Sequence, residues 1–420
     1  MKHVAMRLVA ALLLTFAFTS ARPQSPGGDA CGTWSGTLNV AGQKLELIFN
    51  ILQREGAPVV TLDIPAQGAK EVPVENNFLS ADSICLGIQA LGVEYQGRFA
   101  DANTIRGTFK QMGYPFALEL KRGAVAAPNR PQTPAEPLPY ATEQVSFANP
   151  SAQGVTLAGT LSLPVGYKKG QKVPVVLMVT GSGPQDRNEE IFCHKPFFVL
   201  ADYLARHGIA SLRYDDRGTA ASTGTFGGCT TADFAADAKA GVDFLRGMKR
   251  FSRIGVLGHS EGGTIAFMLA AKRQADFIVT LAAPAMKGDT LLACQSNALM
   301  RQKGVAAKVT TEQIRAQVKA AGDAWMGSFI DYDPAADIKN TTIPVLALNG
   351  SLDYQVPADG NLSLIRSLLT GKNRDNKFVV FDGLNHLFQH AATGAGDEYY
   401  TIEETMAPEV MKTVAEWIRK

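Results

Sequence analysis

The chain has 420 residues, more than one hydrophobic core usually serves, so we expect more than one domain. Hydrophobic residues make up 46% of the sequence and charged residues 19%, a composition that excludes extensive disorder. The 41 basic residues nearly balance the 39 acidic ones and do not cluster, so the sequence predicts no nucleic-acid partner.

The first 21 residues have the layout of a secretory signal peptide. Lys2 and Arg7 precede an apolar run over residues 8–18, and small residues up to Ala21 provide a cleavage site. The run is shorter than a membrane-spanning helix needs. We therefore expect an exported protein, periplasmic or secreted, without stable membrane insertion after cleavage. Without Lys2 and Arg7, 39 basic and 39 acidic residues remain, so the net charge is then near zero.

Residues 30–122 have the pattern of a small all-β domain. Short stretches such as "TWSGTLNV" and "KLELIFNIL" alternate between apolar and polar residues, with turn-forming Gly, Asn, Asp and Pro between them. This domain carries no cluster of ionisable residues, and a binding, dimerising or stabilising role all stay open. Residues 123–140 contain five prolines between positions 128 and 139, which predicts an extended linker.

The five cysteines permit disulfides in an exported protein. The pairs Cys31–Cys85 and Cys193–Cys229 would leave Cys294 unpaired, although the sequence alone does not determine the connectivity. No Cys-x-x-Cys occurs, and we expect neither a metal nor an organic cofactor.

Residues 141–420 alternate between apolar, β-rich runs and helix-length segments. The expected strands are 173–179, 210–214, 254–258, 277–283, 343–349 and 377–381. The expected helices are 195–207, 230–249, 260–273, 360–370 and 405–419. This alternation predicts an α/β domain with a mostly parallel central sheet. The segment 285–340, between the expected strands 277–283 and 343–349, is longer than an ordinary connection between two parallel strands. It has two helical segments, so we expect a lid insertion there.

Ser260 lies in "GVLGHSEGG", directly after the expected strand 254–258 and before a helix. A Gly-x-Ser-x-Gly sequence in this setting predicts a nucleophile elbow, because the tight turn needs glycine and presents the hydroxyl at a helix N-terminus. We expect the neighbouring His259 to point into the scaffold and to have a packing role.

A serine nucleophile needs a base and an acid that orients the base. His386 and His390 are the histidines after Ser260, and His386 follows the strand 377–381 in "FDGLNHLF", whereas His390 is expected on a helix. Asp353 follows the strand 343–349 in "LNGSLDYQVP". The alternative candidates for the acid fit less well. Asp331, Asp333 and Asp337 lie before that strand, and Asp382 is too close to His386 in the sequence.

An oxyanion hole would use two backbone N–H groups. We expect one from Glu261, whose side chain we interpret as incidental, and one from the loop "TGSGP". Ser182 is the first choice in that loop and Gly183 the second.

The pieces "TGSGP", "GHSEGG", "SLDYQVP" and "LNHLF" occur in this order, and on them residues 141–420 resemble the α/β-hydrolase superfamily. The segment "RYDDRGTAASTG" also resembles the Asp-x-Arg-Gly loop of its serine-aminopeptidase-like and acyl-peptidase-like branches. This resemblance implies structural roles for Asp215 and Arg217. A β-rich domain ahead of such a hydrolase is similar to a group of bacterial exported carboxylesterases. The expected oxyanion loop "TGSGP" differs from the usual loop of the superfamily, because it starts with Thr180-Gly181 instead of His-Gly.

We therefore expect an enzyme that hydrolyses small-molecule carboxylic esters through Ser260, His386 and Asp353 and an acyl-enzyme intermediate. Two alternatives stay open, a serine peptidase or acylaminoacyl hydrolase using the same triad, and a non-catalytic glycan- or cell-wall-binding protein on the same scaffold. The sequence does not indicate the oligomeric state.

Overall fold

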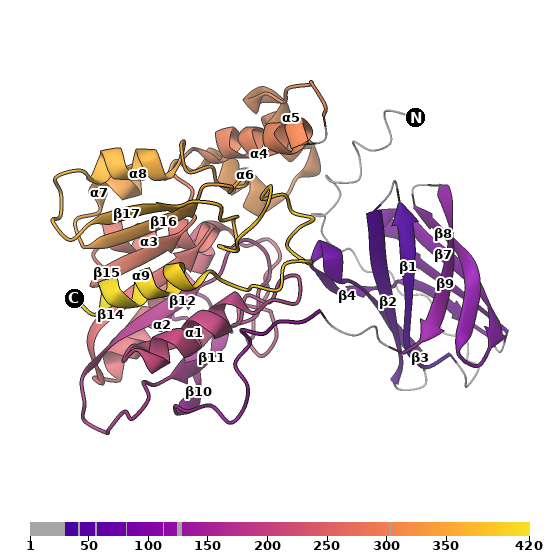
Figure 1. Ribbon diagram of the computed structural model, residues 1–420, viewed down its shortest axis with the longest axis horizontal. Helices are drawn as coiled ribbons and strands as arrows, with labels where there is room; N and C mark the ends of the chain where they lie inside the picture. Colours follow the sequence, from indigo (N-terminus) through magenta and orange to yellow (C-terminus); the bar gives the residue numbers. More distant parts are fainter. Residues whose placement is uncertain are drawn as a thin grey trace. The chain divides into compact units, whose positions relative to one another are not determined.

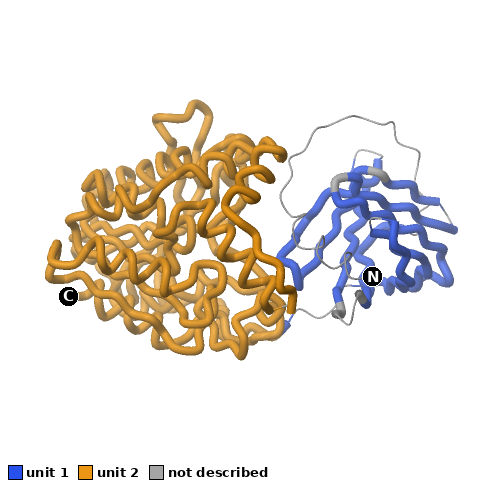
Figure 2. Tube along the Cα trace, turned by 90° about the horizontal axis from the view of Figure 1, so that it is seen from above, with its two compact units in different colours: residues 1–128 blue, residues 129–420 orange. Residues whose placement is uncertain are grey.

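The computed structural model describes residues 30–420 apart from 41–42, 55–56, 81, 112, 124–127 and 303, so the expected signal peptide lies outside the described residues. The chain divides into two compact units, residues 1–128 and 129–420 (Figure 2). Within the described ranges, every helix is too short or too polar to cross a membrane.

The first unit is a nine-stranded sheet in the order β4-β3-β2-β1-β9-β8-β7-β6-β5, and every neighbouring pair is antiparallel. Burial alternates along the strands, as at Ile84, Leu86 and Ile88, because successive side chains point to opposite faces. The strands are β1 (Gly32–Val40), β2 (Gln43–Arg54), β3 (Ala57–Ile64), β4 (Ala69–Pro73), β5 (Asn76–Leu79), β6 (Ser83–Ile88), β7 (Val93–Asp101), β8 (Thr104–Gln111) and β9 (Tyr114–Arg122).

The expected Cys31–Cys85 disulfide is wrong. Cys31 directly precedes β1 and Cys85 lies on β6, and three strands separate β1 from β6 in the sheet. Neighbouring strands are about 4.8 Å apart, whereas a disulfide needs Cα atoms within about 7 Å of each other. The Cys193–Cys229 disulfide is also not formed. The Cys229 thiol instead donates to the carbonyl of Thr225 at 3.3 Å.

The second unit contains an eight-stranded sheet in the order β10-β11-β13-β12-β14-β15-β16-β17 (Figure 1). The pairs β10–β11 and β11–β13 are antiparallel, and the other five pairs are parallel. The strands are β10 (Thr142–Ala148), β11 (Thr156–Ser162), β12 (Val173–Val179), β13 (Ala210–Tyr214), β14 (Phe251–His259), β15 (Phe277–Leu281), β16 (Val345–Gly350) and β17 (Lys377–Phe381).

Helices cover both faces of this sheet, and β12 shows why the sequence requires it. Val175 and Leu177 belong to one hydrophobic core, while Val176 and Met178 belong to the other. A strand buried on both faces has a continuous apolar sequence, as "VPVVLMV" does. One core includes α2 (Thr231–Gly247), α3 (Glu261–Ala271) and α8 (Leu362–Leu369), and the other includes α1 (Pro196–Arg206) and α9 (Pro408–Ile418).

Between β15 and β16 the chain forms four consecutive helices, which are α4 (Gly288–Gln302), α5 (Thr311–Ala321), α6 (Ala324–Asp331) and α7 (Ala335–Asn340). Ala293, Ile314 and Ile330 form a small separate core there. The Arg315 guanidinium joins these helices through ion pairs with Asp289 at 2.6 Å and Asp331 at 2.8 Å.

The second half of the expected linker belongs to the second unit. The Arg130 guanidinium donates to the backbone carbonyls of Phe192, Tyr400 and Ile402 at 2.8–3.0 Å. Gln132 donates to the carbonyl of Met406 at 2.8 Å. This segment is therefore held along its length by hydrogen bonds rather than being only a spacer.

Candidate active site

Ser260 occupies the turn between β14 and α3 with φ 52° and ψ −118°, a backbone conformation that residues other than glycine rarely adopt. Gly258 and Gly262 flank Ser260, and a side chain would not fit at either position. A Cβ added at Gly258 would lie 2.0 Å from the carbonyl oxygen of Gly262, and one at Gly262 would lie 2.1 Å from that of Val179. The turn is thus a tight, strained strand-to-helix connection with Ser260 at the N-terminus of a helix.

Asp353 and His386 come together from the loops that follow β16 and β17. Their side chains are buried, and Nδ1 of His386 lies 2.8 Å from Oδ2 of Asp353. The backbone N–H groups of Gln355 and Val356 donate to Oδ1 of Asp353 at 2.9 and 2.8 Å, and the Asn349 amide donates to Oδ2 at 3.2 Å.

Both carboxylate oxygens of Asp353 accept in these bonds, so Asp353 is the acceptor in its hydrogen bond with His386 as well. The proton of the His386–Asp353 hydrogen bond must therefore be on Nδ1 of His386. Nε2 of the same ring is then left without a proton, and it can accept one.

The other histidine considered as base, His390, has a different role. It lies outside any helix, contrary to expectation, and forms ion pairs with Glu404 at 2.9 Å and Glu409 at 3.2 Å. Its side chain is 56% exposed, so it belongs to the surface.

His386 lies beside the Ser260 turn. Its ring centroid is 4.8 Å from that of His259, the residue before Ser260, and its carbonyl oxygen is 3.1 Å from Nε2 of His259. Within the described part of the chain, the Ser260 hydroxyl forms no hydrogen bond, to His386 or to any other group.

The loop after β12 packs against the same turn. A Cβ added at Gly181 would lie 3.3 Å from Cβ of Ser260, so the backbone of this loop approaches the serine closely. The Gly181 N–H is already used, since it donates to Oε1 of Glu189 at 2.7 Å. The N–H groups of Ser182 and Glu261, the two expected oxyanion donors, have no acceptor among the described residues. They are thus available to a ligand.

The strand order and the positions of these loops decide the fold: the serine turn follows β14, the aspartate loop follows β16 and the histidine loop follows β17, all at the carboxyl ends of parallel strands. The second unit has the α/β-hydrolase fold.

Comparison with known proteins agrees with this fold. A family model described as serine aminopeptidase, S33, matches residues 195–324. The chain is similar to Esterase EstD of Thermotoga maritima, with 29% identity over 296 residues that cover 67% of this chain and 70% of the relative.

Two solved esterases are also similar. The Pyrococcus furiosus esterase Pf2001 is 19% identical, with 70% of this chain and 98% of that chain covered and a TM-score of 0.46. Est1E from Butyrivibrio proteoclasticus is 18% identical, with 66% of this chain and 99% of that chain covered and a TM-score of 0.44.

The expectation that the Glu261 side chain is incidental was wrong. This side chain makes specific contacts within the second unit, residues 129–420, which we call the hydrolase unit. It is buried, and its Oε1 accepts hydrogen bonds from Thr231 at 2.5 Å and from the indole N–H of Trp325 at 2.8 Å. Burial raises the pKa of the Glu261 carboxyl, and hydrogen bonds from Thr231, Trp325 and Ser182 oppose that rise. Because Trp325 belongs to α6, this hydrogen bond connects the four-helix segment to the Ser260 turn.

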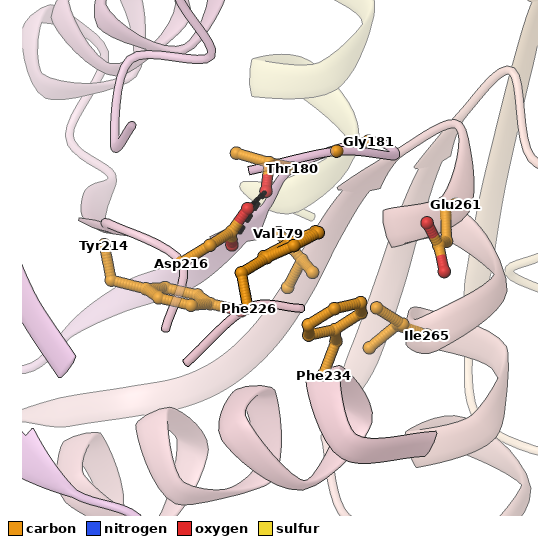
Figure 3. A pocket seen from close by; sticks show the side chains of 10 residues that line it. Val179, Thr180, Gly181, Tyr214, Asp216, Phe226, Phe234, Glu261 and Ile265 are labelled. Carbon is orange, nitrogen blue, oxygen red and sulfur yellow. Dashed lines mark hydrogen bonds between the residues drawn. The ribbon is translucent and has the colours of Figure 1, made fainter. Parts of the chain in front are cut away.

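A small pocket of the hydrolase unit adjoins Gly181 and Glu261 (Figure 3). Asp216 lies in it, and the Thr180 hydroxyl donates one hydrogen bond shared between the two oxygens of its carboxylate, at 3.1 and 3.2 Å. Burial raises the pKa of Asp216 well above its usual value. The pocket is lined by Val179, Thr180, Gly181, Gly183, Tyr214, Asp216, Phe226, Phe234, Glu261 and Ile265.

Asp215 and Arg217 hold the loop after β13. The carboxylate of Asp215 accepts two hydrogen bonds from the Arg187 side chain at 2.6 and 2.9 Å. Arg217 pairs in the same bidentate manner with Asp237 at 2.6 and 2.8 Å. The first pair joins two loops, and the second joins the loop after β13 to α2. Within the described residues, His, Cys, Asp and Glu side chains form no group of three or more suited to a metal ion.

Proposed function

We propose that the protein is a serine hydrolase that cleaves carboxylic esters, with Ser260 as nucleophile, His386 as base and Asp353 as the residue that orients the base. The observation that carries the proposal is the buried hydrogen bond between His386 and Asp353 beside a strained serine turn. The similarity to Esterase EstD supports ester bonds as the substrate class.

In the proposed reaction, Oγ of Ser260 attacks the acyl carbon while Nε2 of His386 takes the hydroxyl proton. The N–H groups of Ser182 and Glu261 stabilise the oxyanion of the tetrahedral intermediate. When that intermediate collapses, the bond from the acyl carbon to the alkoxy oxygen breaks, and His386 gives its proton to the leaving alcohol. Water then attacks the acyl-enzyme with His386 again as base, which releases the acid and restores Ser260.

The four helices α4–α7 are in a suitable position to control substrate access as a lid. Their connection to the site is the hydrogen bond from Trp325 to Glu261, the residue that supplies one proposed oxyanion donor. We propose that this segment, together with the pocket beside Gly181, determines which acyl groups are accepted. The export of the protein remains a further proposal that rests on residues 1–21.

The decisive experiment is hydrolysis of 4-nitrophenyl acetate by the wild type and by Ser260→Ala. The substitution should lower kcat about 10⁶-fold, as removal of a triad serine does elsewhere. Ser367→Ala is a matched control, because that serine is exposed on α8 and its hydroxyl bonds only the carbonyl of Leu364. A Ser260→Ala variant within tenfold of the wild type would exclude Ser260 as the nucleophile.

A peptidase using the same residues is the second candidate, because the matching family model is described as serine aminopeptidase. Parallel assays on 4-nitrophenyl acetate and on aminoacyl-nitroanilides distinguish the two. We expect higher kcat/KM on the ester, and a clear preference for the anilides would make the protein a peptidase.

A further inference from the structure

A second buried histidine–carboxylate pair lies next to the proposed triad. Nδ1 of His259 is 2.8 Å from Oε1 of Glu189, and only 7% of His259 and 3% of Glu189 is exposed. His259 is the last residue of β14, and Glu189 lies in the loop between β12 and α1. The proposed mechanism assigns no role to either residue.

The hydrogen bonds determine the protonation of this pair. Nε2 of His259 faces the carbonyl oxygen of His386 at 3.1 Å, and a carbonyl can only accept, so Nε2 carries a proton. Oε1 of Glu189 also accepts the Gly181 N–H at 2.7 Å, so this oxygen acts as a carboxylate acceptor towards Nδ1 as well. Both ring nitrogens of His259 therefore face oxygen acceptors, which is the hydrogen-bond pattern of an imidazolium beside a carboxylate.

The electrostatic surroundings agree with this assignment. Burial lowers the pKa of His259, but the charge and hydrogen bond of Glu189 outweigh burial and raise that pKa above its usual value. The other titratable groups that face the ring are His386, whose ring centroid is 4.8 Å away, and Asp353. The small pocket beside the pair is otherwise lined by apolar residues, which are Pro196, Phe197, Leu281, Leu387, Phe388 and Met406.

The pair connects three segments that are far apart in the sequence. Glu189 holds the backbone of the proposed oxyanion loop at Gly181, and His259 holds the main chain of His386. Glu189 itself has φ 53°, a conformation that costs energy for a residue with a side chain and persists only where the surroundings enforce it.

We propose that the Glu189–His259 ion pair is a positioning device, which fixes the loop of the proposed oxyanion donor Ser182 relative to the main chain of the base. This inference rests on the proposed function. Neither residue touches the reacting atoms. They instead hold the proposed oxyanion loop and His386 in position relative to each other. A displacement of about 1 Å in such positions is enough to lower the rate about 100-fold.

The test compares Glu189→Gln in the full-length chain with the wild type and with a control, Glu190→Gln. The control makes the same change at the next residue, which is partly exposed and pairs with Lys195 at 3.7 Å. Kinetics on 4-nitrophenyl acetate are measured from pH 5 to pH 9. Glu189→Gln should lower kcat roughly 10–100-fold with KM changed less than about threefold, since positioning is lost and binding is kept.

The pH profile separates positioning from a general loss of structure. Without the Glu189 carboxylate, His259 loses its stabilised positive charge, and protonation of the nearby His386 becomes easier. The acid limb of kcat/KM should then move to higher pH by about half a unit or more. A merely loosened fold would leave this limb in place.

A Glu189→Gln variant with the kcat and pH profile of the wild type would overturn the inference and leave the proposed function standing. A wild type that neither hydrolyses esters nor reacts at Ser260 would overturn both. If Glu189→Gln does not fold, NMR of ¹⁵N-labelled histidine in the wild type decides. Two ring protons on His259 at pH 7 support the pair, and one ring proton refutes it.

Discussion

At the scale of single residues, the site depends on how Asp353 is held. Its carboxylate accepts two backbone N–H groups and one amide N–H besides the His386 ring. This arrangement fixes the tautomer of His386, so that the unprotonated Nε2 is the nitrogen available to Ser260. The proposed role of Asp353 is therefore to select the tautomer of His386 that carries its proton on Nδ1.

Asp353→Asn should therefore lower kcat by about 10⁴-fold and change KM little. An asparagine can keep the backbone hydrogen bonds, but its amide would donate to Nδ1 of His386 and favour the wrong tautomer. The measurement is steady-state hydrolysis of 4-nitrophenyl acetate. Asp382→Asn is the control. Asp382 directly follows β17, and among the described residues its carboxylate accepts a hydrogen bond from the Ser351 hydroxyl alone, at 3.1 Å. A loss of less than tenfold at position 353 would contradict the assignment.

The residues proposed for the reaction could be predicted because each follows a recognisable strand in a fixed order. Ser260, Asp353 and His386 carry that signal. Glu189, Asp216 and the side chain of Glu261 do not. A single carboxylate in a loop looks the same in the sequence whether it is solvated or buried against Gly181 or Trp325. Only the folded arrangement shows which of them are buried and bonded.

At the scale of elements, the close packing of α3 positions Ser260, the proposed nucleophile. The helix starts at Glu261, and Gly262 faces the backbone carbonyls at the end of β12 with no space for a side chain. A larger residue would displace the helix start, and with it Ser260 and the Glu261 N–H.

Gly262→Ala should destabilise the protein by about 1–3 kcal/mol, because the added methyl overlaps backbone that cannot move freely. It should also reduce esterase activity. Gly247→Ala is the matched control. This glycine is an exposed residue of α2 with open space around it, and alanine there should raise stability by about 0.5–1 kcal/mol. Chemical denaturation measures both. Equal stability changes in the two variants would show that α3 does not pack as described.

The elements that the sequence predicts well are those buried on both sides. The strand 173–179 coincides with β12, and the expected helix 195–207 differs from α1 by one residue at each end. The antiparallel β10 was missed because it lies at the sheet edge and buries only Phe147, so it has no continuous apolar run. The Cys31–Cys85 expectation failed because cysteine spacing carries no information about the strand order of the first unit.

At the scale of the whole molecule, the chain comprises two units, and the segment before β10 belongs to the second one. The five prolines indicate that no central strand or helix forms there, which led to the expectation of a linker over 123–140. The sequence did not reveal that Arg130 and Gln132 bind backbone groups of the hydrolase unit. These contacts are made with backbone N–H and carbonyl groups, which have no sequence signature.

A fragment of residues 129–420 should therefore fold and retain the kcat/KM of the full chain on 4-nitrophenyl acetate. A fragment of residues 141–420 should be less stable by about 2 kcal/mol or more, because the charge-assisted hydrogen bonds of Arg130 are lost. Thermal unfolding of both fragments tests this. Equal melting temperatures would show that residues 129–140 do not stabilise the unit.

The central claim is that Ser260 is a nucleophile activated by His386. Its most direct test is reaction of the folded full-length protein with a fluorophosphonate probe, followed by mass spectrometric mapping of the modified peptide. The account predicts one adduct, on Ser260, that forms at least about 10³-fold more slowly in a His386→Gln variant. A folded wild type that forms no adduct, or forms it on a different serine, would contradict the account.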